Sequence, residues 1–580
     1  MTNRLSEATL RNWRRLAVTD SSERLQARAN KTSSKRRIVP LEYLTNRRNL
    51  SRLQQLLALL AGKDCRQPDV LFSLGRNLLR RKNILDRPHV QAVLADYPWQ
   101  VIAELETYPL PEDEFDFLGL LYQCLKSEGE KNRQGSYYTP LPLIHQLLQE
   151  VSCPEHADWL DPCCGSGAFL LAAPVRQPQQ LTGIDIDELA VMLAKINLLL
   201  KFPEQEFSPR IFCRNFLHPW PDELLAGSGL HTGLQYDCIV SNPPWGACLP
   251  SRTGAAVNLP AEETFSSMLQ QSYRLLRPGG ELHFLLPESA LQIKAHREFR
   301  RFLLQDCRLH KISVFRNRFA GVSSRSIGVS ISRNPPGAEF CFCQDGASIS
   351  LFRKTILQDE QLRVQFLSVQ DRRILSALYE RQAATLAGST WGLGIVTGDN
   401  RGKLRDCGGE GWEAVYTGRE ISEYQLHPPR KFIRFDRSQL QQAAPDWLYR
   451  APVKLVYKFI SPRPVFTCDQ GQHLFLNSAN MLIPAIPGLD CLTVLAFLNS
   501  LLFRYIYQKQ FTDLKVLQGN LLRLPFPAVS SRQDRCLSQL AQGILAGEAD
   551  CRAELENQVF AAFAVPDRDR DYILEQLQKS

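Results

Sequence analysis

The segment 236–246, YDCIVSNPPWG, holds the residues of this 580-residue chain whose types and spacing are best suited to chemistry. Two consecutive prolines follow an apolar run, fix the backbone there and withhold two N–H donors, so the carbonyl oxygens around them stay free as acceptors. The side chain of Asn242 adds another carbonyl oxygen. Two rigid acceptors can hold an amino group that carries two hydrogens. Trp245 adds a flat face on which an aromatic base can stack.

A glycine-rich turn lies upstream, at 161–167 (DPCCGSG). Glycine lets the backbone approach a ligand closely, and the start of the following helix offers unpaired N–H groups. In a Rossmann-like sheet, such a turn binds a nucleotide-like cofactor. Asp185 follows Asp161 by 24 residues, the spacing of an acid that binds ribose hydroxyls. The alternatives are a tight turn without a ligand, and an acid that caps the helix starting near residue 188.

The elements that must position these residues alternate between residues 135 and 335. Short apolar runs predict strands at 158–160, 181–186, 236–240 and 281–286, and amphipathic periodicity predicts helices at 188–201 and 264–276. Buried strands separated by helices predict a parallel, doubly wound α/β sheet.

The rest of the chain divides by charge and periodicity. Residues 1–52 hold thirteen Lys and Arg against four acids, a net charge of +9 that equals the charge of the whole chain. Such a basic arm either contacts a polyanion or is a solvated tail. We expect six segments: the arm at 1–52, a helical region at 53–130, the α/β domain at 131–335, a connector at 336–390, an irregular mixed domain at 391–530 and helices at 531–580.

Composition excludes several classes of protein. With 44% apolar and 22% charged residues, the chain has globular composition, and its apolar runs are too short to cross a membrane. Its first residues lack the apolar core of a signal peptide. The sixteen cysteines show no zinc-ligand spacing. We therefore expect a cytoplasmic protein with reduced thiols, no metal and no membrane partner.

The order of three motifs resembles that of the gamma class of N6-adenine DNA methyltransferases, enzymes of restriction-modification systems that use S-adenosyl-L-methionine. The motifs are GSYYTP at 135–140, the glycine-rich turn, and NPPW at 242–245, which matches the family pattern of Asp, Asn or Ser, two prolines, and an aromatic residue. The resemblance implies a Rossmann-like methyltransferase domain at 131–335. It also implies a mixed α/β target-recognition domain at 391–530.

The resemblance further implies roles for individual residues. Asn242 and the Pro243 carbonyl, in the motif that continues with Pro244, would hold the N6 amino group of a flipped-out adenine while Trp245 stacks on its ring. His296 stands where the family has a second stacking aromatic. The cofactor-binding residues implied by the family are Tyr138, Thr139, Asp161, Cys163, Gly165, Gly167, Asp185 and Asn215. The DNA contacts expected in the recognition domain are Arg401, Lys403, Arg419, Lys454 and Lys458.

These roles imply methyl transfer from S-adenosyl-L-methionine to adenine N6 in a short sequence of double-stranded DNA. A separate restriction endonuclease is an expected partner, and a monomer is expected because one chain carries both catalytic and recognition parts. A first alternative is a methyltransferase of RNA bases or protein glutamine, which use the same kind of site. A second is a DNA-binding module with a degenerate core, because Asn215 and His296 depart from the family pattern. A fused nuclease is disfavoured, because no acidic pair with a nearby lysine precedes the motifs.

Overall fold

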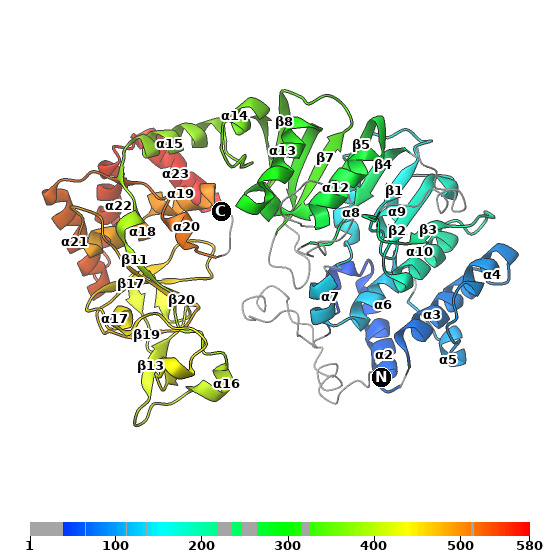
Figure 1. Cartoon of the computed structure of the whole chain (residues 1–580), viewed down its shortest axis with the longest axis horizontal. Coiled ribbons are helices and arrows are strands. Elements are labelled where there is room, and N and C mark those ends of the chain that lie inside the picture. Colours follow the sequence, from blue (N-terminus) through cyan, green and yellow to red (C-terminus); the bar gives the residue numbers. More distant parts are fainter. Residues whose placement is uncertain are drawn as a thin grey trace. The chain divides into compact units, whose positions relative to one another are not determined.

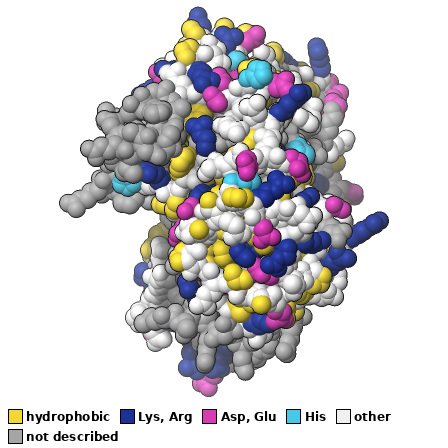
Figure 2. Space-filling model, turned by 90° about the vertical axis from the view of Figure 1, so that its right-hand side faces the viewer, with side chains coloured by type: hydrophobic (Ala, Val, Ile, Leu, Met, Phe, Trp, Pro, Cys, Tyr) yellow, Lys and Arg dark blue, Asp and Glu magenta, His cyan; other side chains and the backbone are white. Residues whose placement is uncertain are grey.

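The computed structural model describes residues 37, 39–63, 65–111, 113–134, 137–218, 235–245, 264–315, 325–511 and 515–579. Most of the basic arm expected at 1–52 lies outside these residues, as do Gly135 and Ser136 of the GSYYTP motif. The chain divides into two compact units, Met1–Val364 and Gln365–Ser580. On the face drawn in Figure 2, basic and acidic side chains are interspersed.

A nine-stranded sheet forms the centre of the N-terminal unit (Figure 1), in the order β3-β2-β1-β4-β5-β7-β6-β8-β9. The five neighbouring strands β3, β2, β1, β4 and β5 run parallel to one another. The strand order changes direction between β1 and β4, which is the place where doubly wound sheets bind ligands. The strands are β1 Trp159–Asp161, β2 Leu181–Asp185, β3 Arg210–Cys213, β4 Tyr236–Ser241, β5 Leu276–Pro287, β6 Arg308–Phe315, β7 Ser326–Ser332, β8 Glu339–Gln344 and β9 Ala347–Phe352.

The sheet is mixed, whereas the sequence pattern predicted a parallel one. Strand β7 is antiparallel to both of its neighbours, β5 and β6. The link from β6 to β7 spans residues 316–325, which is shorter than the dozen or so residues that a parallel crossover needs. The chain therefore returns directly and inserts β7 between β5 and β6.

The predicted elements of this sheet form close to their expected places. Helix α10 is Glu188–Lys201, as predicted, and Asp187 caps it by accepting from the N–H groups of Leu189 and Ala190. Strand β5 begins five residues before the predicted 281, because the Pro-Gly-Gly segment is absorbed as a register shift against β4. Helix α12 is Thr264–Arg274.

The leucine-rich N-terminal helices share one continuous core with the sheet. Helix α3 lies so close to α10 that a Cβ on Gly75 would come within 2.6 Å of the Ile196 side chain. The region expected at 53–130 thus packs as part of the α/β unit. The other helices of this unit are α2 Leu50–Ala61, α3 Gln67–Arg81, α4 Pro88–Ala95, α5 Ala103–Glu106, α6 Phe117–Leu125, α7 Glu128–Gln134, α8 Leu141–Leu148, α9 Ala168–Ala172, α13 Arg297–Gln305 and α14 Arg353–Leu357.

The segment expected as a connector, 336–390, has structure of its own. Strands β8 and β9 form a hairpin that extends the nine-stranded sheet, with β8 parallel to β6. The N-terminal unit therefore runs to residue 364, beyond the boundary expected at 335.

The C-terminal unit contains two four-stranded sheets, ordered β11-β20-β17-β18 and β12-β16-β13-β19, and a cluster of helices. Among the described residues, no single helix is long and apolar enough to cross a membrane. Helices α18 (Cys491–Asn499) and α19 (Leu501–Gln510) form one bent pair that reaches the length and hydropathy of a membrane span only when the two are taken together. The strands of the C-terminal unit are β10 Gln382–Ala384, β11 Thr390–Gly392, β12 Leu404–Arg405, β13 Glu413–Tyr416, β14 Ile421–Ser422, β15 Gln425–Leu426, β16 Lys431–Ile433, β17 Lys454–Lys458, β18 Phe466–Asp469, β19 Leu474–Phe475, β20 Ala479–Ile483 and β21 Phe526–Pro527. Its helices are α15 Val369–Glu380, α16 Asn400–Lys403, α17 Asp446–Tyr449, α18 Cys491–Asn499, α19 Leu501–Gln510, α20 Gln518–Leu521, α21 Ser531–Ala546, α22 Cys551–Ala562 and α23 Asp567–Lys579.

Candidate functional site

Three chemistry-bearing segments meet at the carboxyl ends of adjacent strands. Asp161 ends β1, Asp185 ends β2, and Asn242 directly follows β4. The order β2-β1-β4 makes these strands neighbours in the sheet. The site expected from the sequence is therefore assembled at the switch point of strand order.

The carboxyl group of Asp161 lies at the centre of this site. It is 1% exposed, and its Oδ1 accepts from the Ser241 hydroxyl at 2.7 Å and from the Cys163 N–H at 3.0 Å. Its Oδ2 is buried without a hydrogen-bond partner among the described residues. Burial raises the pKa of Asp161 to about 7. The site thus holds a buried acceptor that is suited to a cationic or N–H donor.

The glycine-rich turn wraps over the end of β1. Gly165 and Gly167 have φ values of +52° and +89°, in the left-handed region that glycine adopts without strain. A Cβ on Gly165 would lie 2.9 Å from the ring of Tyr138, so the turn packs tightly under that ring. Asp185 accepts from the Gly165 N–H at 2.8 Å and from the Asp187 N–H at 2.9 Å.

A polar cluster of residues from α6, the turn itself and α10 holds the glycine-rich turn in place. Asp116, the N-cap of α6, accepts from the Ser166 hydroxyl, from the Gly119 N–H at 2.9 Å and from the Asn197 amide at 2.8 Å. The same amide group of Asn197 donates to the Ser166 carbonyl at 2.9 Å. Asp116 is half-buried, and the loss of water around its carboxyl raises its pKa above the ordinary value. We call Asp116, Ser166 and Asn197 the turn clamp.

A second polar cluster ties α6 to the end of β2. Lys126 donates to Asp187 at 3.0 Å, and the Tyr122 hydroxyl donates to the same carboxylate oxygen. Burial would raise the pKa of Asp187, but the Lys126 ammonium and these hydrogen bonds bring it below its ordinary value. Helix α6 therefore supports both the turn and the start of α10.

The NPPW motif lies beside this site in a defined orientation. The Asn242 amide Nδ2 donates to the Tyr137 carbonyl at 3.0 Å, which directs the side-chain carbonyl Oδ1 to the opposite side. The Trp245 indole Nε1 donates to the Leu285 carbonyl of β5 at 3.3 Å. Pro243 is buried and Pro244 half-buried. The Asn242 amide group thus connects the NPPW motif to Tyr137 of the upstream motif.

The remaining predicted cofactor residues surround the same strand ends. Thr139 is 7% exposed, and Tyr138 is half-buried with a hydroxyl that has no partner among the described residues. Burial raises the pKa of Cys163, so its thiol is neutral. Asn215 follows β3, and its amide oxygen accepts from the Leu217 N–H at 3.1 Å.

His296 lies inside the protein rather than on its surface. Its ring is 4% exposed and packs edge-to-face on Phe265, with 5.2 Å between ring centroids. Burial lowers the pKa of His296 to about 4, so the ring is neutral at pH 7. Nearby, the buried guanidinium of Arg300 donates to the carbonyls of Ala290 and Ile293 at 2.8 and 2.9 Å. These hydrogen bonds connect α13 to the loop after β5.

Two of the five lysines and arginines expected to contact DNA have structural partners instead. Lys454 is fully buried and donates to Asp469 at 2.6 Å and to the Tyr449 carbonyl at 2.6 Å, so the expectation that it contacts DNA is wrong. Lys403 donates to the carbonyls of Thr397 and Gln439. Lys458 is half-buried, and Arg401 and Arg419 are exposed.

Some residues of the site were not identified from the sequence. The turn clamp joins residues 116, 166 and 197, and nothing in their spacing shows that they meet. Ile186, between Asp185 and Asp187, is 72% exposed at the end of β2 and offers an apolar face beside the predicted ribose site. The sequence signal that could have identified Ile186 is an apolar residue between two acids at the end of a strand.

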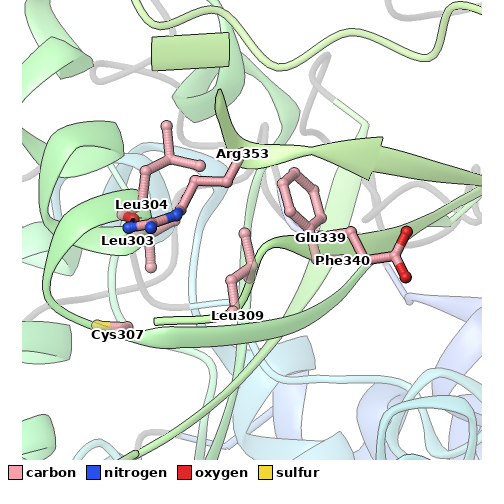
Figure 3. Close-up of a pocket in the computed structure, with 8 residues that line it drawn as sticks. Leu303, Leu304, Cys307, Leu309, Glu339, Phe340 and Arg353 are labelled. Atoms are coloured by element: carbon pink, nitrogen blue, oxygen red, sulfur yellow. Dashed lines mark hydrogen bonds between the residues drawn. The ribbon is translucent and has the colours of Figure 1, made fainter. Parts of the chain in front are cut away.

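A small recess lies elsewhere in the N-terminal unit, between α13 and strands β6 and β8 (Figure 3). Leucine side chains, Cys307 and Phe340 line it, and the Arg353 guanidinium donates to the Leu304 carbonyl at 3.2 Å. Strands β5 and β7 separate this recess from β4, so it is distinct from the site.

Comparison with known proteins agrees with this geometry. Residues 114–323 match the family described as N-6 DNA Methylase. This region is therefore similar to an N-6 DNA methylase domain. Residues 413–526 match the family described as TaqI-like C-terminal specificity domain. The region similar to the methylase family contains the turn clamp, the glycine-rich turn and the NPPW motif. The region similar to the specificity domain lies in the C-terminal unit.

Individual relatives are distant. The Type II methyltransferase M.VspI from Vibrio sp. (strain 343) is 25% identical over 374 residues, which cover 61% of this chain and 85% of that protein. The Type I restriction enzyme EcoEI methylase subunit from Escherichia coli is 26% identical over 211 residues, and the match covers 33% of this chain and 40% of that subunit. The solved structure of the Type IIL restriction-modification enzyme MmeI in complex with DNA has a TM-score of 0.54 at 12% identity and covers 92% of this chain and 98% of that one. This last likeness concerns the fold alone.

The turn clamp predicts a stability effect that is localised to the glycine-rich turn. In Asp116→Ala, the Gly119 N–H, the Ser166 hydroxyl and the Asn197 amide lose their shared acceptor, at a cost of about 3 kcal/mol. We expect a lower thermal midpoint and faster hydrogen–deuterium exchange at residues 163–170. Asp86→Ala, at an exposed acid, is the control. Unchanged exchange at the turn in Asp116→Ala would refute the clamp.

The buried pair of Lys454 and Asp469 predicts a second effect. Lys454→Met removes the ammonium and leaves the Asp469 carboxylate buried without it, at a cost of about 3–5 kcal/mol. Lys458→Met, on the same strand but half-buried, should change stability by less than about 1 kcal/mol. Thermal unfolding of both variants measures the difference, and equal midpoints would show that the Lys454 ion pair carries no structural role.

Proposed function

We propose that this chain transfers a methyl group from S-adenosyl-L-methionine to the N6 amino group of adenine within a short sequence of double-stranded DNA. The observation that carries the proposal is the position of Asn242: its amide is anchored to the Tyr137 carbonyl, and it lies at the end of β4, next to the strand that ends in Asp161. An amino-group acceptor is thereby placed beside a cofactor turn. The N-6 DNA methylase family and the specificity domain support adenine in DNA as the substrate.

The residues at the strand ends fit S-adenosyl-L-methionine. The unpartnered Oδ2 of Asp161 suits the ammonium group of the methionine part, and Thr139 and the neighbouring backbone would hold the same end. Asp185 retains lone pairs for ribose hydroxyls, since each of its oxygens accepts one backbone N–H. Exposed Ile186 would pack against the adenine ring of the cofactor, and Asn215 would accept its amino group.

In this proposal the chain contributes positioning and electrostatics. S-adenosyl-L-methionine, when bound, supplies an electrophilic methyl group. Asn242 Oδ1 and the Pro243 carbonyl would accept the two N6–H hydrogens of the target adenine, which concentrates the nitrogen lone pair for attack. Trp245, tied to β5 through its indole N–H, would stack on the base after it leaves the duplex. The neutral thiols of Cys163 and Cys164 take no part.

The His296 ring packs on Phe265, so to serve as a second stacking face it would have to turn toward the base. Its neutral form at pH 7 suits stacking on an aromatic ring. We assign the base contact to Trp245 first and to His296 second.

The names of the relatives support a biological setting. M.VspI is a Type II methyltransferase, and the EcoEI protein is the methylase subunit of a Type I restriction enzyme. We propose that this chain serves a restriction-modification system in the cytoplasm, with a separate endonuclease as partner. The specificity domain on the same chain supports action as a monomer. RNA bases and protein glutamine remain the alternative substrates, which the first experiment below distinguishes.

The first test is modification-sensitive long-read sequencing of DNA from a methylation-free host that expresses the chain. We expect N6-methyladenine in one short motif with the wild-type chain and a loss of at least about 100-fold in Asn242→Ala, because the amino-group acceptor is gone. Asn242→Asp keeps an acceptor oxygen and should retain part of the activity. Asn557→Ala, at an exposed position on α22, should match the wild type. Methylation that persists in Asn242→Ala would refute the mechanism, and methylation of RNA or protein alone would refute the substrate.

The buried Asp161 predicts a pH dependence of cofactor-analogue binding. Its pKa of about 7 lies above the ordinary carboxyl value, so the free protein loses stability as the pH rises from about 4 to 7 and this group ionises. A ligand ammonium favours the ionised form. The dissociation constant of S-adenosylhomocysteine should therefore fall by up to about tenfold per pH unit between pH 5 and 7.

Isothermal titration calorimetry measures this dependence. Asp161→Asn should bind more weakly, with a flatter profile over the same range, because its side chain does not ionise. Ser241→Ala, which removes one hydrogen bond to the carboxyl, should keep the pH dependence. A wild-type profile as flat as that of Asp161→Asn would refute the assigned contact.

A further inference from the structure

The small sheet β12-β16-β13-β19 lies in the C-terminal unit (Figure 1, around β13). One of its faces combines arginine and aromatic side chains. Arg405 pairs with Phe432, and Phe432 pairs with Ala414 on the other neighbouring strand. Directly opposed residues share a face, and so do residues two apart on a strand. Arg405, Phe432, Arg434, Trp412 and Ala414 therefore lie on one face, which we call the Arg–Trp face.

The opposite face of the sheet is committed to the core. Ile433 and Val415 are fully buried there, with Leu404 packed against the same cluster. On the Arg–Trp face, by contrast, Arg405 and Arg434 are exposed, and Trp412, Phe432 and Ala414 are half-buried. The aromatic rings are therefore only partly covered on this side.

Both guanidinium groups stack on the same indole. The Arg405 Cζ lies 4.2 Å from the centroid of the Trp412 ring, and the Arg434 Cζ lies 5.5 Å from it. Stacking occupies the flat faces of the guanidinium groups and restricts their motion, while the N–H donors at their edges stay available. The pair is thus preorganised to bind an anion.

Two of the acids next to these arginines pair with other cations. Asp406 pairs with Lys431, and Glu413 pairs with Arg450 at 2.5 Å. Glu410, at the tip of the glycine-rich turn before Trp412, is exposed. Among the described residues, neither Arg405 nor Arg434 forms an ion pair with a carboxylate, so the face retains positive charge.

We propose that the Arg–Trp face binds the phosphate backbone of duplex DNA, with Arg405 and Arg434 as the contacting residues and Trp412 as the residue that positions them. This inference rests on the proposed function for the identity of the polyanion. The fork of N–H donors on each guanidinium matches two phosphate oxygens. Glycines 408, 409 and 411 beside the face present no side chain that would keep a phosphate backbone away. The contact orients the DNA and carries no sequence preference of its own.

The test measures binding of the full chain to a 30-base-pair duplex of random sequence at several salt concentrations, with S-adenosylhomocysteine present. We expect Arg405→Ala and Arg434→Ala each to weaken binding by about tenfold and to reduce the slope of log affinity against log salt by about one. Trp412→Leu should weaken binding by about threefold at unchanged charge, and Trp412→Phe should restore it. Arg381→Ala and Arg535→Ala, at exposed arginines without ion pairs among the described residues, are the charge-matched controls.

The outcomes separate this inference from the proposed function. A double variant, Arg405→Ala with Arg434→Ala, that keeps the wild-type salt slope while the wild-type chain still methylates DNA overturns the inference alone. Equal losses in the control variants overturn it as well, since any surface arginine would then serve. If the wild-type chain binds DNA through this face but methylates none, the inference holds and the function fails. Absence of DNA binding by the wild-type chain overturns both, and thermal unfolding checks that the variants are folded.

Discussion

The buried carboxyl group of Asp161 is the interaction on which the site depends. It connects the end of β1 to β4 through the Ser241 hydroxyl and to the glycine-rich turn through the Cys163 N–H. A carboxyl that is 1% exposed and retains an unpartnered oxygen is costly in the free protein, and burial raises its pKa to about 7. In the proposed function, a ligand ammonium offsets this cost, so the buried carboxyl contributes to cofactor binding.

The N-terminal helices share one core with the sheet, and one of them, α6, also holds the glycine-rich turn in place. Asp116 at the start of α6 reaches Ser166 in the turn and Asn197 on α10, and Lys126 on α6 reaches Asp187. A glycine turn without such support would lose much of its preorganisation, since glycine restricts the backbone least. The region before the methylase motifs is therefore part of the machinery that positions the proposed cofactor.

Basic residues of the C-terminal unit have two different roles. Lys454 is buried inside the unit, where its ion pair with Asp469 stabilises the pairing of β17 and β18. Arg405 and Arg434 lie outside on an indole, with their donors available. Their opposite roles come from the face of the sheet on which each side chain lies.

Several features of this protein could be predicted from its amino-acid sequence, because they rest on short-range patterns. Apolar periodicity located α10 to the residue and the main strands to within a few residues, and the motifs at 161–167 and 242–245 located the site at their carboxyl ends. Local spacing sets these features, since helices and turns are specified by neighbours along the chain. The antiparallel β7, the joining of Asp116 to Ser166 and the burial of Lys454 required the folded chain, because each depends on residues distant in sequence that packing brings together.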